Sequence, residues 1–143
     1  MEPNEKHIKI IAEELESGMK CFFALKTGEI RTVPDFDDWL ELDDEVFKQE
    51  LRAIDEKRDD YFEFSRPGSR ESYQIMVDFA EEIEHTRLQN KLLNALDKRK
   101  PFQHFKREID NSGEYRQKWF DYRKMRYIQW VKEQINTNKT AFE

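Results

Sequence analysis

The stretch MKCFFALKTGEIRTV, residues 19–33, decides the fold class of this sequence. Residues 19–25 and 29–33 are rich in aromatic and β-branched side chains, which is typical of two β-strands. Gly28 stands between them, and a glycine allows the positive φ angle that a tight turn needs. Pro34 ends the second strand because its nitrogen carries no hydrogen to donate. The stretch therefore predicts an antiparallel β-hairpin near the N-terminus.

Helical patterns lie on both sides of this hairpin. Apolar side chains recur every three or four residues in the segments 5–17 and 45–57, which predicts a helix in each. The run YFEF at 61–64 has the composition of a third strand. Ser69 and Thr86 are candidate N-caps for later helices. The rest of the chain predicts four helices, at about 69–83, 86–96, 101–109 and 114–134.

The predicted elements fit one domain of the α+β class. The chain has 143 residues, close to the usual size of a single domain. We expect a mostly helical protein, with a small antiparallel hairpin or three-stranded sheet near the N-terminus and a C-terminal helical bundle. Residues 5–64 would form the part that contains the sheet, and residues 69–135 the helical part. Residues 136–143 are expected to form a frayed tail.

The composition predicts a folded, soluble chain with a very charged surface. Charged residues make up 39% of the sequence, well above the average for a domain. Even so, 34 of the 143 residues are Leu, Ile, Val or Phe, which is more than a disordered chain carries. No apolar run is long enough to span a membrane, and the acidic N-terminus does not resemble a signal peptide. With one cysteine and no disulfide, we expect a cytoplasmic location and no membrane.

Four phrases of the sequence, in their order and spacing, resemble a known family. They are TGEI at 27–30, SYQIMVDF at 72–79, KPFQHFK at 100–106 and RQKWF at 116–120. Together they resemble bacterial uncharacterised protein family 0158, from about residue 19 to residue 131. The resemblance implies a small bacterial cytosolic protein. It implies no activity, so it provides no functional residues.

Metal-binding patterns are weak in this sequence. Glu81 and His85 stand four residues apart on a predicted helix, but they supply two ligands where a site needs three or four. A solvated pair is the alternative interpretation. The acidic run at 35–45 fails the calcium-loop pattern, because Leu40 occupies the position that requires glycine. We therefore predict no metal ligands.

Catalytic patterns are also lacking. Cys21 lies in an apolar strand, where burial is expected to raise its pKa and leave the thiol inert. The four glycines are isolated, so no phosphate-binding loop can be built from them. We predict no catalytic residue and no cofactor, and no small-molecule ligand is implied. A site assembled from residues distant in sequence stays open.

The two halves of the chain differ in charge. Residues 1–84 hold 11 lysines and arginines against 24 acidic residues, whereas residues 85–143 hold 14 against 7. The basic half also carries many aromatic residues. Positive charge attracts phosphates, and exposed rings stack on bases. Arg116, Arg123 and Lys124 lie near one face of the last predicted helix, which makes them candidate contacts with a nucleic acid or an acidic partner.

A second interpretation explains the same pattern without a ligand. The aromatic residues recur at spacings typical of a buried helix face, and the basic half can be neutralised by the acidic half or by a second copy of the chain. We therefore expect a non-enzymatic binding or regulatory protein whose partner is a protein or another copy, with nucleic-acid binding as the alternative. Trp39 is a candidate anchor for a protein partner, although it can equally pack on the sheet.

Overall fold

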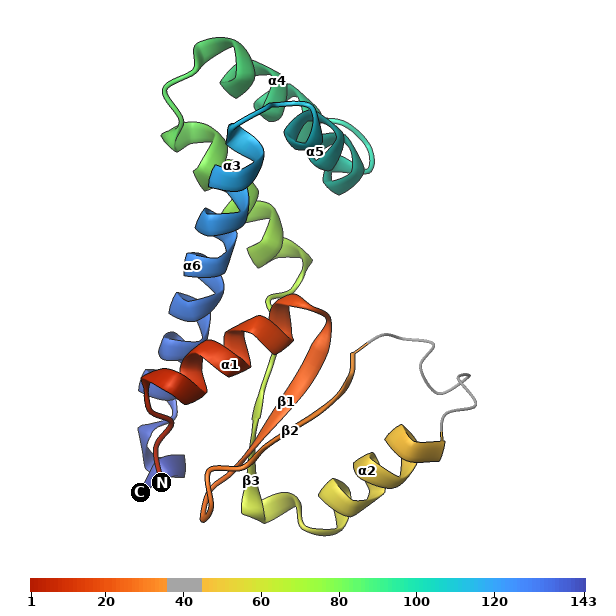
Figure 1. The fold of residues 1–143 in the computed structure, drawn as a ribbon, viewed down its shortest axis with the longest axis vertical. Coiled ribbons are helices and arrows are strands. Elements are labelled where there is room, and N and C mark those ends of the chain that lie inside the picture. Colours follow the sequence, from red (N-terminus) through yellow and green to blue (C-terminus); the bar gives the residue numbers. More distant parts are fainter. Residues whose placement is uncertain (36–44) are drawn as a thin grey trace. The chain divides into compact units, whose positions relative to one another are not determined.

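A computed structural model describes residues 1–35 and 45–143 of the chain. These residues group into two compact units (Figure 1). Unit 1 comprises residues 1–66 and 127–143, and unit 2 comprises residues 67–126. The described residues form six α-helices and one three-stranded antiparallel sheet, so the predicted α+β class is confirmed. The expectation of a single domain stays a prediction.

The sheet belongs to unit 1. Its strands are β1 (Met19–Ala24), β2 (Ile30–Pro34) and β3 (Tyr61–Phe64). The strand order is β2-β1-β3, and β1 is antiparallel to both neighbours. The turn between β1 and β2 contains Gly28 with φ of 78°, as the sequence predicted. A Cβ atom at this position would lie 2.6 Å from the sulfur of Met1, so that flexible side chain would have to shift, and the positive φ angle itself favours glycine.

Helix α1 (Glu5–Glu16) covers one face of the sheet. Its fully buried residues Ile11 and Leu15 share a core cluster with Cys21 and Phe23 of β1. The helix begins at an Asn4 N-cap, in agreement with the predicted segment 5–17. This apolar face anchors the helix because burial of aliphatic side chains is the main favourable term in folding.

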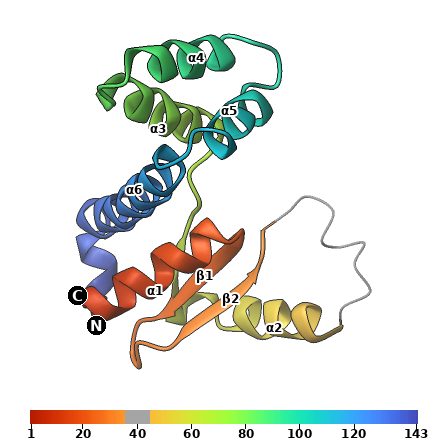
Figure 2. The ribbon, with the colours of Figure 1, turned by 45° about the horizontal axis from the view of Figure 1, so that its top comes forward.

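Helix α2 (Glu45–Glu56) packs on the other face of the sheet (Figure 2). Its buried Ile54 meets Phe22 of β1 and Val33 of β2. Neighbouring residues of β1 point to opposite faces, so both faces of this strand are covered. That double coverage explains why residues 21–24 of the central strand are all apolar and buried.

The C-terminal segment completes the core of unit 1. Helix α6 (Tyr115–Thr137) is followed by a short 3₁₀ helix, η3 (Lys139–Phe142). Phe142 is only 7% exposed, and its ring centroid lies 4.8 Å from that of Phe62. The sequence predicted a frayed tail at 136–143, and the structure corrects this, because the aromatic ring of Phe142 is packed in the core.

Unit 2 is helical. It contains α3 (Ser69–Glu82), α4 (Thr86–Leu96), α5 (Pro101–Asp110) and the first part of α6. All four predicted helices are present. Their apolar faces form one core cluster of buried residues, namely Ile75, Met76, Phe79, Ala80, Leu88, Leu92, Leu96, Phe105, Ile109 and Trp119. This unit positions the surface features described below.

Two helix N-termini differ from the sequence prediction. The N-cap of α3 is Gly68, and Ser69 is already the first helical residue. The N-cap of α4 is His85, whose Nδ1 accepts a hydrogen bond from the backbone N–H of Leu88 at 3.0 Å. The predicted cap, Thr86, is therefore displaced by its neighbour, because an imidazole nitrogen supplies the acceptor that a hydroxyl was expected to supply.

Candidate functional site

A basic surface of unit 2 lies around the connection between α4 and α5. Residues 86–110 hold seven lysines and arginines against three acidic residues. Several of these cations are exposed and adjoin an exposed aromatic ring. We name the set Lys98, Arg99, Lys100, Phe102 and Lys106 the α4–α5 cationic surface.

The backbone of the connection presents these side chains to solvent. Lys100 adopts a left-handed conformation, with φ of 56°, directly before Pro101 at the first position of α5. Proline suits that position because its fixed φ is already helical. Within the part of the chain that the structure describes, Lys98, Arg99 and Lys100 form no ion pair. Three adjacent cations therefore face solvent without a carboxylate partner.

Several of the aromatic rings of the basic half are not available for stacking on bases. Phe105, Trp119 and Tyr127 are buried. The rings of Phe105 and Trp119 meet edge to face, with centroids 4.9 Å apart. Phe102, by contrast, is 43% exposed. The alternative interpretation of the pattern as a core face is thus confirmed for these three residues.

The candidate contact residues on α6 lie in different environments. Arg116 bonds Asp110 at 3.3 Å, and its guanidinium lies over the ring of Phe120 at 4.7 Å. Arg123 is half-buried and Lys124 is exposed, and both make interactions within the protein. Sequence reasoning placed these three cations on one helix but gave no sign of their internal partners. That they contact a nucleic acid or an acidic partner stays a prediction.

Trp39 falls within residues 36–44, which lie outside the described residues. Its role as an anchor for a protein partner stays a prediction. The acidic run at 35–45 lies almost wholly within the same segment.

One basic side chain of α6 is neutralised inside unit 2. Arg126 donates a hydrogen bond to the carboxylate of Asp78 at 2.7 Å, and another to the hydroxyl of Tyr122 at 2.7 Å. Burial by itself would raise the pKa of Asp78, but hydrogen bonds from Arg126 and Gln74 outweigh it, so this pKa lies below its ordinary value. The pair ties α3 to α6 and contributes no free positive charge.

We expect Asp78→Asn to lower the free energy of unfolding by roughly 1 kcal/mol at pH 7, because the charged partner of Arg126 is lost. A carboxyl with a lowered pKa stabilises the fold above its unfolded pKa, and this contribution is lost as the pH falls through its folded pKa. The difference between parent and variant should therefore disappear in strong acid. Urea denaturation at pH 7 and in strong acid measures the difference in unfolding free energy between parent and variant. An equal difference under the two conditions would contradict the ion pair.

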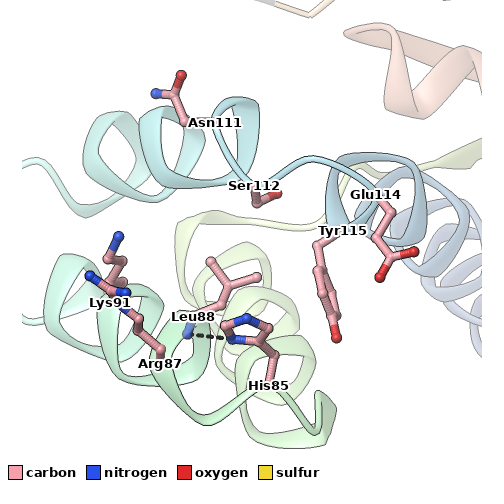
Figure 3. A pocket seen from close by; sticks show the side chains of 8 residues that line it. All are labelled: His85, Arg87, Leu88, Lys91, Asn111, Ser112, Glu114 and Tyr115. Carbon is pink, nitrogen blue, oxygen red and sulfur yellow. Dashed lines mark hydrogen bonds between the residues drawn. The ribbon is translucent and has the colours of Figure 1, made fainter.

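A surface pocket of about 490 Å³ lies within unit 2 (Figure 3). Its lining residues come from the start of α4, the end of α5 and the start of α6. They are His85, Arg87, Leu88, Lys91, Asn111, Ser112, Glu114 and Tyr115. Sequence reasoning missed this pocket, because residues 85–91 and 111–115 are brought together by packing alone. The available signal was the spacing of Arg87 and Lys91, four residues apart on a predicted helix.

Cys21, which the sequence predicts to be a buried thiol, is inaccessible to solvent. Its side chain is 0% exposed in the core of unit 1. Burial, with a smaller contribution from Glu14, raises the pKa of the thiol to about 12. The predicted burial of Cys21 is confirmed, and a buried, protonated thiol is a poor nucleophile and a poor metal ligand at neutral pH.

Glu81 and His85 were considered as metal ligands from their spacing, and no metal site was predicted from them. In the described part of the chain, no three His, Cys, Asp or Glu side chains are grouped so that they could share a metal ion. None of the described helices is both long and apolar enough to cross a membrane.

Comparison with known proteins places this chain in a family. Residues 18–143 match the sequence model of the uncharacterised protein family UPF0158. A UPF0158 protein of Pseudomonas aeruginosa is 32% identical over 71 residues, which are 50% of this chain and 46% of the relative. The match thus spans about half the length of that curated relative. No solved structure matches the chain. The family inferred from the four sequence phrases is confirmed, and this chain belongs to the uncharacterised protein family UPF0158.

Proposed function

We propose that the protein acts by binding a nucleic acid through the α4–α5 cationic surface. The observation that carries this proposal is the group of three adjacent exposed cations, Lys98, Arg99 and Lys100, which have no ion-pair partner among the described residues. Contact between such a cation and a phosphate of a nucleic acid is favourable, because binding releases the counterions condensed on the nucleic acid. The exposed ring of Phe102 adjoins them and offers a face for a base.

The negative charge of the whole chain does not prevent this binding. The formal net charge is −6, and the acidic excess lies in residues 1–84. At physiological ionic strength the Debye length is about 8 Å, so distant charges are screened and local charge dominates at contact. The cations next to α5 therefore act on a phosphate backbone largely independently of any acidic side chain that is farther away than this length.

A protein partner is the second candidate function. The sequence favoured it, and the burial of Phe105 and Trp119 supports it, because these rings cannot stack on bases. An acidic surface on another protein, or the acidic half of a second copy, would also satisfy the α4–α5 cationic surface. The regulatory role and the cytoplasmic location expected from the sequence stay predictions.

The decisive variant replaces the three cations by glutamine: Lys98→Gln, Arg99→Gln and Lys100→Gln together. We expect affinity for labelled single-stranded RNA or duplex DNA to fall on the order of a hundredfold near 0.1 M salt. The slope of log affinity against log salt should become shallower by roughly 2 to 3, since each lost phosphate contact removes somewhat less than one unit. Fluorescence anisotropy between about 50 and 200 mM salt measures both quantities.

A matched control removes the same charge from unit 1. Lys6, Lys9 and Lys26 are exposed and form no ion pair with the described residues, so their triple glutamine variant changes net charge equally. We expect this control to bind like the parent. If the parent fails to bind at low salt, the nucleic-acid proposal is refuted and the acidic protein partner becomes the first candidate. If both triple variants lose affinity equally, binding depends on overall charge and the assignment to the α4–α5 cationic surface is refuted.

A further inference from the structure

The pocket in Figure 3 has cations at one end and a carboxylate at the other. We infer that it binds a small phosphate monoester whose body carries hydroxyl groups, the chemistry shared by sugar phosphates and nucleotides. Its volume of about 490 Å³ lies within the usual range for small-molecule sites. The sequence implied no small-molecule ligand, and this site shares no residue with the α4–α5 cationic surface, so the inference goes beyond the proposed function.

The cationic end consists of Arg87 and Lys91. They stand four residues apart on α4 and therefore share a face of that helix. Figure 3 shows their charged groups side by side. Both are exposed, and neither forms an ion pair with any residue that the structure describes. Two neighbouring positive charges repel each other, and a dianionic phosphate relieves that repulsion while accepting the forked hydrogen bonds of a guanidinium.

The middle of the pocket offers two neutral hydrogen-bond donors beside an apolar surface. The Nδ1 atom of His85 accepts the N–H of Leu88, so the neutral ring carries its proton on Nε2 and can donate from there. Tyr115 adds its hydroxyl, and its ring lies edge to face with His85 at 5.7 Å. Lys118 lies over the Tyr115 ring at 4.7 Å and helps to hold it. Leu88 contributes the apolar surface.

The opposite end accepts hydrogen bonds. Glu114 presents a carboxylate at the end away from Arg87 and Lys91 (Figure 3). The hydroxyl of Ser112 donates to the carbonyl of Ile109, which leaves its oxygen free to accept. Acceptors repel a second anionic group but bind hydroxyl donors. The pocket therefore distinguishes a phosphate ester with a hydroxylated body from inorganic phosphate or a compact dicarboxylate.

The phosphate ester has two possible sources. One is a free sugar phosphate or nucleotide. The other is the 5′-phosphorylated end of a single strand, and only this version rests on the proposed nucleic-acid binding. The two sources share the same contacts with Arg87 and Lys91, so one set of variants tests both.

The first experiment is calorimetric titration of the full chain with ribose 5-phosphate, ribose and inorganic phosphate. We expect ribose 5-phosphate to bind with a Kd below about 1 mM and ribose not to bind. The double variant Arg87→Gln with Lys91→Gln should lower the affinity for ribose 5-phosphate at least about tenfold, because charge-assisted hydrogen bonds are lost. Glu114→Gln should lower the affinity for ribose 5-phosphate but leave the affinity for inorganic phosphate unchanged.

A second titration compares one single strand with a 5′-phosphate and with a 5′-hydroxyl. A preference for the phosphate that disappears in the Arg87 and Lys91 double variant identifies the strand end as the source. Binding of ribose 5-phosphate without that preference identifies a free ligand. The triple glutamine variant of Lys98, Arg99 and Lys100 is the control, and it should bind ribose 5-phosphate like the parent even where it no longer binds nucleic acid.

The inference is overturned if neither phosphate compound binds better than its hydroxyl counterpart. It is also overturned if the Arg87 and Lys91 double variant binds like the parent. Both side chains are exposed on α4, so circular dichroism and thermal melting of the variant should match the parent and exclude misfolding as a cause. Failure of the nucleic-acid proposal leaves the ribose 5-phosphate result intact, which keeps the two proposals separable.

Discussion

Replacing Phe105 by alanine should lower the free energy of unfolding by about 3–5 kcal/mol. The side chain is 2% exposed and lies in the core cluster of unit 2, with its ring 4.9 Å from that of Trp119. The substitution removes the buried ring and leaves a cavity that its neighbours fill only in part. Chemical denaturation followed by tryptophan fluorescence measures the loss, because Trp119 lies at the altered site.

The same helix supplies a matched control. Phe102 belongs to α5 as well, but it is 43% exposed. Phe102→Ala removes the same ring and should cost less than about 1 kcal/mol, since little apolar area is withdrawn from water at that position. Equal losses in the two variants would contradict the described packing of α5. If Phe102→Ala also weakens nucleic-acid binding at unchanged stability, its ring contributes to the α4–α5 cationic surface.

Cys21 should make the protein less stable as the pH rises above about 9. The folded-state pKa of the thiol is about 12, against 9.0 for the free group, because the side chain is buried. Above pH 9 the unfolded chain releases this proton while the folded chain keeps it, so unfolding becomes progressively easier. The stabilising contribution is complete below pH 9. It falls by roughly 1 kcal/mol per pH unit towards pH 12.

The comparison that isolates this effect is Cys21→Ala. Lysine and tyrosine side chains also titrate above pH 9, but they do so equally in both proteins. The variant is expected to be less stable than the parent at pH 7 because of the cavity, and the gap should narrow as the pH rises. Guanidinium denaturation at pH 7 and at pH 10.5 measures the two gaps. A constant gap would show that the thiol titrates normally in the folded protein.

The hairpin and the helices could be predicted because their signals are local. Residues 19–33 combine strand-forming side chains with Gly28 at the turn, and nothing distant is needed to interpret them. Helix N-caps were harder to predict, because several neighbouring residues can occupy the cap position. Gly68 and His85 occupy the cap positions that were assigned to Ser69 and Thr86. Each prediction missed by one residue, since the choice depends on where the chain enters the helix.

Features that depend on distant residues could not be predicted. Phe142 packs against the rings of Phe23 and Phe62, which lie far from it in the chain. A short polar tail gave no sign of that contact, so residues 136–143 were expected to fray. The pocket could not be predicted for the same reason, because Arg87 and Glu114 line one pocket only in the folded unit 2.

The sequence showed where the positively charged residues are, but it did not show which of them are neutralised by an ion pair. Lysines and arginines are visible in the sequence, whereas the partners that neutralise them are not. Arg126 is paired with Asp78, and Arg116 with Asp110. The three cations at residues 98–100 lack such partners within the described residues, and only the structure separates these two groups. The distribution of charge in the sequence therefore indicates which region is basic. The ion pairs in the structure then identify which of its cations lack a partner among the described residues.

The order of the two units along the chain has a consequence for how the protein is made. Unit 2 is a continuous segment, residues 67–126, set between the two parts of unit 1. Its core can close as soon as α6 begins to leave the ribosome. Unit 1 must wait, because Val131, Ile135 and Phe142 belong to the same core cluster as the first helix and strand. During synthesis the part of this core that Val131, Ile135 and Phe142 cover therefore stays exposed until those residues have emerged, and that interval is when a chaperone would engage it.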